Sequence, residues 1–537
     1  MPKLNCVERW RAEIVVFVVL PISFFLRLFK SFKRWWFAPK PEAHNNRVHA
    51  VLSAMRSNSS CDKLIRTDRS VYESHSVRNS NKTKVRQVPL RELRAILGLT
   101  VEQGKKIIHV EPGATVGEVT NFLQEKKLQL ECCLEMEDAT LGGLAMAQGM
   151  TTHSHVCGLL SETVVEYEVI TGNGNVVIVR EDNEHADLFR ALPMSHGSLG
   201  LLVSLKLRVV PARKYVLLTY QPMLEATELH DKYTDVLNKA ATNHPETPFF
   251  VEAIAYSRQE SVLMTGHLVD DIDSSIGQMN SIGMWYKPWF YKHVETILSN
   301  RKVVTEYIPM RDYLMRHDRS MCMTMGTIIP YGNHPIFRFF LGWLLPPQLS
   351  FMKSSHTKET REASVRKQCY QDICFPASMF LKALDVNDRL FNIYPLLVYP
   401  CKVINRGGLV KVGNREKHQL GDGSYVQMNM NLGIYGIPPE LKNDVFQLFP
   451  MVGRVRKLEQ WLRDNNGFQH TYCDSFQTKN EFHHMFDHIQ YNKMRNTYGA
   501  EGKFPTVYDK TRPEMDVFQW LEEEEGINGG SDDTVLD

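Results

Sequence analysis

The segment from residue 141 to 160, LGGLAMAQGMTTHSHVCGLL, has the residue types that bind a phosphate anion. It carries four glycines together with the hydroxyl side chains of Thr151, Thr152 and Ser154. Glycine lets a backbone approach a ligand closely, and clustered backbone N–H groups form a concave site for anions. Hydroxyl groups add donors for phosphate oxygens. The segment predicts a loop that holds a pyrophosphate, although a glycine-rich connection between two buried strands explains the same composition. Its spacing is neither that of a Rossmann glycine motif nor that of a P-loop.

The flanking sequence predicts the elements that would position this loop. Upstream, KIIHVEPG predicts a short strand that ends at a Pro-Gly turn, and residues 116–128 predict a helix. Downstream, VVEYEVI and VVIVR predict a hairpin closed at Gly172-Asn173-Gly174. A short helix at 187–192, a second small-residue turn at 195–200 (SHGSLG) and a strand at 201–210 follow.

This order of elements resembles the FAD-binding domain of the vanillyl-alcohol-oxidase and p-cresol-methylhydroxylase flavoproteins, over residues 48–212. The resemblance implies an α+β fold in which a two-part FAD-binding domain is joined to an α/β substrate (cap) domain. It also implies that the flavin lies extended along the 141–160 and 195–200 segments. The residues that it assigns to FAD are Gly142, Gly143, Gln148, Gly149, Met150, Thr151, Thr152, His153, Ser154, His155, Gly158, Leu159, Leu160, Ser195, Gly197, Gly200, Tyr508 and Lys510.

The chain departs from that family in its first cofactor loop. Many members have a basic, glycine-rich loop near the start of the domain, but residues 77–88 read VRNSNKTKVRQV and contain no glycine. Arg78, Lys82, Lys84 and Arg86 could contact phosphate as charges. A noncovalent flavin is expected, with His153, His155 and the Cys132-Cys133 pair as the alternative covalent tethers.

Segments in the second half narrow the resemblance to the Δ24-sterol reductases within this family, from about residue 12 to 510. They include SIGMWYKPWFYKHVE, EYIPMRDYLMRHD, IIPYGNHPIFRFFLGWLLPP, YCDSFQTKNEFHHMFD and FPTVYDK. This resemblance implies reduction of the side-chain C24=C25 double bond of a sterol, with NADPH reducing the FAD and hydride leaving flavin N5. It also implies a single-pass protein of the endoplasmic reticulum membrane, or the Golgi, with the catalytic body facing the cytosol.

An isolated alkene sets specific demands on such a site. No carbonyl is present to accept charge, so a proton must be added before or together with hydride. The candidate acids are Tyr307, Tyr313, His317, Tyr472 and Asp474, and we predict catalytic roles for Tyr313, His317, Tyr472 and Asp474. Arg311, Arg316 and Arg319 are candidates for a dinucleotide phosphate, or for a salt-bridged surface helix. The aromatic runs at 285–291 and 337–343 predict a wall for substrate or membrane, or plain packing. Glu252, within the apolar run FFVEAIAY, is expected to be paired inside the fold.

The composition excludes several other classes of function. A net charge of +2 with scattered basic residues gives no basis for nucleic-acid binding. The ten cysteines show no zinc-ligand spacing, so no metal is expected, and a chain of 537 residues needs no disulfides. Two alternatives to a reductase stay open: an alcohol or lactone oxidase of the same fold, and a non-enzymatic sterol-binding protein.

The N-terminus predicts attachment to membrane lipid. Residues 14–26, IVVFVVLPISFFL, are uncharged but shorter than the roughly 20 residues that span a bilayer. Lys30, Lys33, Arg34, Trp35 and Trp36 follow, as in an interfacial anchor. A buried N-terminal helix is the alternative. The expected organisation is an anchor at 1–37, an FAD-binding domain at 42–212, a cap at 214–453, a segment returning to the flavin at 454–512 and a disordered acidic tail at 514–537.

Overall fold

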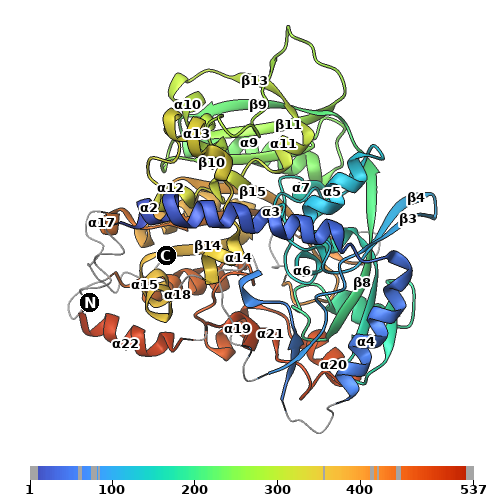
Figure 1. The fold of residues 1–537 in the computed structure, drawn as a ribbon. Coiled ribbons are helices and arrows are strands. Elements are labelled where there is room, and N and C mark those ends of the chain that lie inside the picture. Colours follow the sequence, from blue (N-terminus) through green and yellow to red (C-terminus); the bar gives the residue numbers. More distant parts are fainter. Residues whose placement is uncertain are drawn as a thin grey trace.

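Two large β-sheets lie next to each other and carry most of the helices on their outer faces (Figure 1). The structure is a computed structural model that describes residues 10–57, 63–73, 82, 85–354, 357–411, 417–419, 423–442, 449–513 and 515–527. A separate pair of short parallel strands, β1 (Ile65–Thr67) and β2 (Arg86–Val88), lies beside the first sheet.

The first sheet has six strands in the order β3-β4-β8-β6-β7, with β5 pairing to β8. The predicted hairpin is confirmed, because β6 and β7 pair antiparallel across the Gly172–Gly174 turn. The helix predicted for 116–128 is too long at its C-terminal end. Helix α5 (Val116–Gln124) starts at a Thr115–Glu118 capping box and stops because Lys127 adopts positive φ and leads into β5. The strands are β3 (Ile96–Glu102), β4 (Lys105–Val110), β5 (Leu128–Leu130), β6 (Val164–Thr171), β7 (Val176–Val179) and β8 (Gly200–Pro211).

The second sheet has ten strands in the order β12-β13-β9-β11-β10-β15-β17-β14-β18, with β16 pairing to β17, and nearly all its pairs are antiparallel. The apolar runs at 216–220, 249–257, 262–267, 393–398 and 426–434 predict strands of the cap, and all fall in this sheet, although β15 starts only at residue 396. The bounds are β9 (Tyr215–Met223), β10 (Phe250–Ala255), β11 (Ser261–Val269), β12 (Gln278–Met279), β13 (Val304–Pro309), β14 (Cys369–Pro376), β15 (Leu396–Asn405), β16 (Lys417–Gln419), β17 (Tyr425–Gly436) and β18 (Phe468–Gln469).

Side chains of β17 alternate between the two faces of this sheet, as a strand requires. Met428, Met430, Leu432 and Ile434 lie in the larger hydrophobic core together with residues of α9 (Ala226–Ala241), α16 (Phe380–Leu390) and α18 (Met451–Asp464). The alternate positions 427, 429 and 431 are Gln, Asn and Asn, and they are buried as well. The face opposite the larger core is therefore polar near β17.

Farther along the second sheet, toward β9 and β13, a separate apolar core contains residues of the helices that follow β12. It also contains residues from the N-terminal helix. The helices that contribute to this core are α10 (Phe290–Asn300), α11 (Met310–Leu314), α12 (Met325–Ile328), α13 (Pro335–Leu341) and η6 (Gly342–Leu344). The same part of the chain also contains η5 (Asp318–Ser320), α14 (Leu349–Ser354) and α15 (Lys358–Lys367).

The 141–160 segment is not the continuous loop that its composition predicts. It forms α6 (Leu141–Ala145) and α7 (Ser154–Cys157), joined by an irregular stretch and followed by η4 (Leu160–Thr163). Buried Leu141, Ala145 and Leu160 anchor these short helices in the larger core. Small residues alone therefore did not exclude helical turns, because the few large side chains of the segment supply enough packing.

The chain after residue 454 returns to the first sheet. Gly499 lies against Gly172 of the hairpin turn so closely that a Cβ on Gly172 would come 1.9 Å from the Gly499 carbonyl oxygen. The Tyr498 hydroxyl meets His185 Nδ1 at 2.8 Å, next to α8 (Ala186–Ala191). The elements of this return are α19 (Lys479–Met485), α20 (Ile489–Thr497) and α21 (Val507–Thr511).

The expectation of a disordered tail from residue 514 is wrong for its first part. Residues 517–527 form helix α22, which packs against α18. Trp520 is buried, and the carboxylate of Glu524 accepts the backbone N–H groups of Val452 and Gly453 at the start of α18. The acidic run thus includes an N-terminal cap for a neighbouring helix, which low hydrophobicity did not indicate.

Candidate active site at the junction of the two sheets

The glycine segment and the SHGSLG turn meet in the folded chain. The backbone N–H of His196 donates to the Met146 carbonyl at 2.9 Å, and Gly197 adopts φ +68°. Lys510 of α21 donates to the carbonyls of His196 and Gly197 at 2.7 and 3.2 Å. The three segments assigned to the flavin by resemblance therefore lie together, with Lys510 fixing the turn from the C-terminal side.

A fourth segment, residues 470–475, joins them at Thr471. The Thr471 backbone N–H and hydroxyl both donate to Gln148 Oε1, at 2.6 and 2.8 Å. His196 Nε2 lies 2.6 Å from the same hydroxyl oxygen. Thr471 thus connects both cofactor segments, and it places the next residue, Tyr472, beside them.

The Tyr472 phenol lies beside the carboxylate of Asp372 on β14, close enough for that charge to raise its pKa. A second phenol, Tyr435 of β17, donates to the same carboxylate, and the Asn431 amide lies 3.4 Å from it. Burial, followed by the Asp372 charge, raises the pKa of both tyrosines well above the usual value. Both phenols therefore keep their protons at neutral pH. Asp372 was not predicted, although a carboxylate within the apolar run CYQDICFP is the same signal that drew attention to Glu252.

A buried ionic cluster adjoins this group. Arg316 is fully buried and donates to both oxygens of Glu252, at 2.9 and 2.7 Å, and to Glu135 at 3.1 Å. His317 Nε2 lies 3.3 Å from Glu252. Burial alone would raise the pKa of Glu252, but Arg316 and His317 outweigh it and hold that pKa low. The paired role expected for Glu252 is confirmed, and His317 belongs to this pairing.

Tyr313 and Thr152 link the ionic cluster to the glycine segment. Thr152 donates its backbone N–H and its hydroxyl to Glu135 Oε1, at 3.2 and 2.8 Å. The Tyr313 hydroxyl donates to Thr152 Oγ1 at 3.3 Å, while the Arg316 guanidinium lies 4.2 Å from the Tyr313 ring centroid. Tyr313, His317 and Tyr472 are therefore brought into one buried region. Asp474 is buried beside it, and its backbone carbonyl accepts hydrogen bonds from Gln371 and Gln469.

His153 and His155 attach the glycine segment to the edge of the cap sheet. His153 stacks on Phe249 with ring centroids 3.8 Å apart, and its Nδ1 is bonded to the Phe249 carbonyl. His155 Nε2 lies 2.9 Å from the Pro248 carbonyl. Burial lowers the pKa of His153 to about 4 and that of His155 to about 3, so both are neutral at pH 7. Their rings are used for docking, and a covalent flavin link through either would require breaking these contacts.

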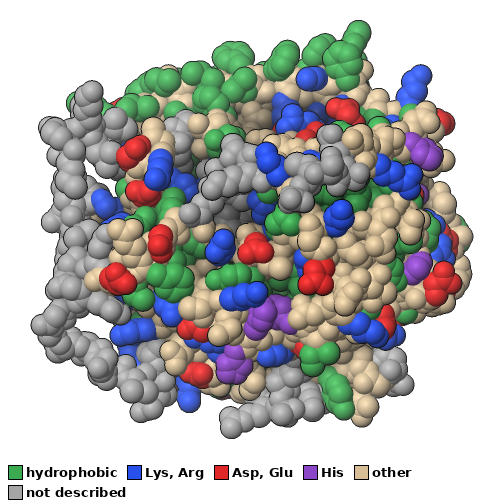
Figure 2. Space-filling model, turned by 90° about the horizontal axis from the view of Figure 1, so that it is seen from below, with side chains coloured by type: hydrophobic (Ala, Val, Ile, Leu, Met, Phe, Trp, Pro, Cys, Tyr) green, Lys and Arg blue, Asp and Glu red, His purple; other side chains and the backbone are tan. Residues whose placement is uncertain are grey.

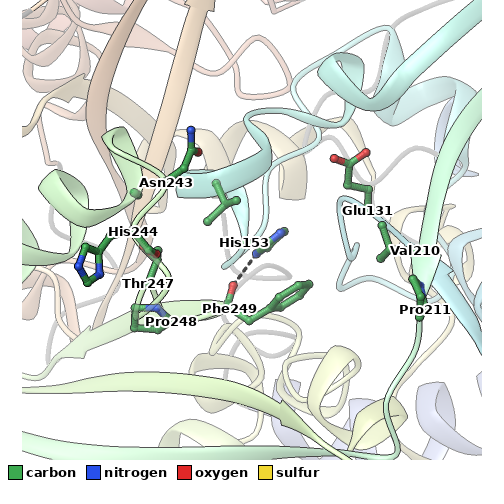
Figure 3. A pocket seen from close by; sticks show the side chains of 11 residues that line it. Glu131, His153, Val210, Pro211, Asn243, His244, Thr247, Pro248 and Phe249 are labelled. Carbon is green, nitrogen blue, oxygen red and sulfur yellow. Dashed lines mark hydrogen bonds between the residues drawn. The ribbon is translucent and has the colours of Figure 1, made fainter. Parts of the chain in front are cut away.

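A cavity of about 400 Å³ opens beside His153, at the same junction. Figure 3 shows His153 between two walls, one from the first sheet and one from the segment that leads into β10. The first wall contains Glu131, Val210 and Pro211, and the second contains Asn243, His244, Thr247, Pro248 and Phe249.

The glycines of the 141–160 segment have different structural roles: close packing, positive φ and an open backbone surface. A Cβ on Gly142 would lie 2.3 Å from Pro112 Cβ, and one on Gly149 would lie 3.0 Å from Leu160 Cβ, so both are required by internal packing. Gly158 adopts φ +75°. Gly143 has an open side, where a Cβ would meet only the Thr140 hydroxyl at 3.0 Å and an Arg69 nitrogen at 3.8 Å.

The residues present fit an FAD molecule at this junction. Two buried polar atoms of the predicted set, Ser195 Oγ and His155 Nδ1, have no hydrogen-bond partner among the described residues. The same holds for the side-chain oxygens of Asn429 and Asn431 on the polar face of the cap sheet. Unpaired buried polar atoms are rare in folded proteins and indicate a missing ligand or water. Arg69, which the sequence did not indicate, adds a half-buried positive charge next to Gly143, paired with Glu73 at 3.8 Å.

Other predicted side chains are used within the protein. Thr151 and Ser154 bind backbone N–H groups of their own segment, and Met150, Leu159 and Leu160 pack beside it. Gly200 starts β8, where a Cβ would come 2.5 Å from a Val169 methyl. Tyr508 donates to the Gln477 carbonyl at 3.1 Å.

The basic residues suggested for phosphate also have protein partners. Arg311 binds Glu137, and Arg319 donates to four backbone carbonyls. Lys82 donates to the carbonyls of residues 67 and 69, and Arg86 to those at the end of α4 (His44–Arg56). Arg78 and Lys84 lie outside the described residues. With Arg316 in the buried cluster, the three arginines at 311–319 do not form the phosphate site that was considered for them.

A strained turn completes the junction. Met321, Cys322 and Met323 have φ of 46°, 51° and 74°, three consecutive non-glycine residues in the left-handed region. Such residues cost of order 1–3 kcal/mol each and persist where the surroundings enforce them, often at active sites. Burial raises the pKa of Cys322 to about 12, with the Asp372 and Glu135 carboxylates as further causes, so the turn lies within reach of both clusters. No sequence pattern indicated it.

Comparisons with known proteins agree with this arrangement. A family model described as "FAD binding domain" matches residues 68–180. The chain is 34% identical to the Δ(24)-sterol reductase of Pisum sativum, over 94% of this chain and 91% of the pea protein. It is 33% identical to that of Rattus norvegicus, over 94% of this chain and 93% of the rat protein. The chain belongs to the Δ(24)-sterol reductase family.

Members of this family are FAD-dependent oxidoreductases, and the vanillyl-alcohol-oxidase type of FAD-binding domain expected from the sequence is confirmed. A D-arabinono-1,4-lactone oxidase of Candida glabrata is also similar, at 25% identity, but over only 34% of either chain. The similarity to an oxidase is therefore partial, whereas the similarity to the reductases includes the cap.

Proposed function

We propose that this protein reduces the side-chain C24=C25 double bond of a sterol, with FAD as cofactor and NADPH as the electron source. The observation that carries the proposal is the position of Tyr472. It follows Thr471, which binds both cofactor segments, and its phenol lies beside buried Asp372. A retained proton next to the flavin segments is what the reduction of an unactivated alkene demands.

The residues that would hold FAD come from four segments. Gly143 and Arg69 would contact phosphate, and Ser195 and Gly197 would contact the cofactor from the second turn. Asn429 and Asn431 would bind it or the substrate from the cap sheet. When bound, FAD supplies the hydride.

Tyr472 is proposed as the proton donor. Because its pKa is raised well above the usual value, it is protonated throughout the physiological range, but it is a weak acid. Proton transfer to the alkene must then accompany hydride delivery rather than precede it. Tyr313, beside the Arg316 guanidinium, is the second candidate, because a cation near the ring favours loss of the phenolic proton.

The ionic cluster of Arg316, Glu252 and Glu135 is proposed to position the two sheets rather than to act on substrate. All three side chains are directed at one another, and Glu135 also binds the glycine segment through Thr152. Ion pairs buried to this degree are costly to break, so they hold the junction in one geometry.

We further propose that the protein works attached to the endoplasmic reticulum membrane with its body in the cytosol. Residues 11–36 form one apolar helix of 26 residues, long enough by length and composition to cross a membrane. A sterol dissolves in the bilayer, so attachment there brings enzyme and substrate together.

The test is anaerobic. The purified full chain is incubated with NADPH, and loss of the flavin's visible absorbance is recorded before desmosterol is added. Reoxidation of the flavin with formation of cholesterol is the expected result. Reduction of the flavin by an alcohol or lactone substrate without NADPH would support the oxidase alternative instead. Purified protein that contains no flavin would support a non-enzymatic sterol-binding protein. A reduced flavin that no 24-unsaturated sterol reoxidises would refute the proposal.

A further inference from the structure

The apolar N-terminal helix does not leave the body of the protein. Figure 1 shows it lying lengthwise across the surface, from α2 (Arg11–Ile14) through the π-helical turn η1 (Val15–Val19) to α3 (Leu20–Trp36). Val16, Leu20 and Ser23 are buried, with exposed fractions of 1% or less. Val16 and Leu20 belong to the apolar core beside β9 and α10.

Three polar side chains of this helix face the protein. Ser23 accepts the backbone N–H of Gln348, and Arg27 donates to the Pro346 carbonyl at 2.9 Å. Arg34 forms a two-pronged pair with Glu118 of α5, at 2.7 and 2.6 Å. These contacts recur along the helix on the stripe that also contains Val16 and Leu20, so the helix is fixed to the body along most of its length.

The opposite side of the helix carries large apolar side chains exposed to solvent. Its exposed residues include Phe17, Phe25, Phe29, Phe32, Trp35 and Trp36, each with more than half of its surface accessible. The pattern is the reverse of that of a surface helix in a soluble domain, whose polar side chains face water.

A second helix extends the same exposed surface. Ile336, Phe339 and Phe340 of α13 have exposed fractions of 64–66%. The end of this helix is joined to the N-terminal helix, because Trp343 of η6 packs edge-on against Phe24 with ring centroids 4.9 Å apart. Arg338 of α13 donates to the carbonyl of Tyr286, which brings the exposed 285–286 turn to the same place.

The aromatic runs noted in the sequence therefore divide between two roles. Trp289, Phe290, Tyr291 and Phe337 are core residues, whereas the other members of the runs point outward. Figure 2 views the molecule from below Figure 1, so the side that carries α3 becomes its upper edge, and hydrophobic side chains gather along that edge. The rest of that view has mixed charges.

We infer that α2–α3, α13 and the 285–286 turn form one membrane-binding surface, and that the N-terminal helix lies in the plane of the bilayer instead of crossing it. The inference rests on the membrane attachment proposed above and specifies its geometry. Large contiguous apolar surfaces of this kind mark interaction sites. The occupant is a lipid bilayer, because tryptophans and the exposed cation Lys33 flank the apolar face as they do at membrane interfaces.

Crossing the bilayer would require the helix to detach. A detached helix would carry Ser23 and Arg27 into the hydrocarbon without their hydrogen-bond partners. It would also expose to water the apolar surface of the body against which Val16 and Leu20 pack. In the in-plane position each polar group keeps its partner, and only the aromatic face enters lipid. The apolar face would reach about 5–10 Å into the headgroup and acyl boundary.

The first experiment is flotation of the full chain with vesicles of dioleoylphosphatidylcholine, which lack net charge. The test variant is Ile336→Ser/Phe339→Ser/Phe340→Ser, which leaves the N-terminal helix intact. The control is Val101→Ser/Ile489→Ser, which removes two apolar side chains that are equally exposed but lie on other elements, β3 and α20. We expect the α13 variant to bind vesicles at least tenfold more weakly than wild type and the control to change less than twofold.

The second experiment locates the N-terminus. An epitope tag ahead of residue 1 is tested for protease digestion in sealed microsomes. Digestion of tag and body together is expected for an in-plane helix, and a protected tag with a digested body would overturn the inference, as would an unchanged affinity of the α13 variant. If wild-type protein does not float with vesicles at all, membrane attachment itself fails, which is a separate result because activity in detergent does not depend on it.

Discussion

Removing one hydroxyl group tests the proposed proton donor most directly. Tyr472→Phe keeps the ring in its half-buried position and deletes only the hydroxyl that lies beside Asp372. A general acid contributes about 10²–10⁴-fold to a rate. At roughly 1.36 kcal/mol per tenfold, the barrier to alkene reduction should rise by about 3–5 kcal/mol.

The matched control is Tyr435→Phe, since Tyr435 donates to the same carboxylate from β17. Each substitution removes one phenol from beside Asp372 and leaves that carboxylate the other phenol and the Asn431 amide. Their effects on folding should therefore be similar. Only the loss at residue 472 should slow the chemistry by two or more orders of magnitude.

The assay separates the two half-reactions in a stopped-flow instrument. Flavin reduction by NADPH should keep its wild-type rate in both variants, and reoxidation by desmosterol should be slow in Tyr472→Phe alone. The wild-type reoxidation rate should be independent of pH from about 6 to 9, because burial and Asp372 keep the pKa of Tyr472 above that range. Equal slowing in both variants would show that the tyrosines support Asp372 and do not donate the proton. Normal reoxidation in Tyr472→Phe would refute the assignment.

Three further changes address folding. Gly142→Ala would place a Cβ 2.3 Å from Pro112, and overpacking of this kind costs about 1–3 kcal/mol, so we expect a lower melting temperature and lower flavin content after purification. Arg316→Met should lower the free energy of unfolding in urea by roughly 3–5 kcal/mol, because it leaves buried carboxylates unpaired. Adding Glu252→Gln should recover part of that loss, whereas additive effects of the two substitutions would show that the pair is not coupled. Burial raises the pKa of Glu459 to about 8, so between about pH 4.5 and 8 the folded state keeps a proton that the unfolded state has lost. The free energy of unfolding should therefore fall as pH rises through this range, by at most roughly 1.4 kcal/mol per pH unit. Glu459→Gln should flatten this slope, and an unchanged slope would contradict the raised pKa.

Local patterns in the sequence predicted much of the cofactor region. The Gly172–Gly174 turn, the start of a helix at residue 116 and the apolar strands were readable because each depends on neighbouring residues. The order of these elements was enough to indicate an FAD-binding domain. A carboxylate inside an apolar strand, Glu252, was rightly read as paired, since a lone buried charge is too costly to persist.

The partners of these residues could not be predicted in the same way. Glu252 meets Arg316, 64 residues later, and Asp372 meets Tyr472 and Tyr435 from different strands. Such contacts depend on which strands become neighbours, and that is set by packing of the whole chain. The same reason explains Arg311, whose charge resembled a phosphate ligand in sequence but is paired with Glu137.

The N-terminal helix shows most clearly which properties follow from the sequence and which from the tertiary structure. Its sequence by itself determined that residues 14–26 are apolar and that basic and tryptophan residues suited to a membrane interface follow them, because hydropathy is a property of the residues themselves. Our inference that the helix lies along a membrane comes from the tertiary structure alone, in which Ser23, Arg27 and Arg34 find partners on the body. The sequence of the helix does not show where its polar side chains will find hydrogen-bond partners, because those partners come from distant parts of the chain and are brought together only by folding.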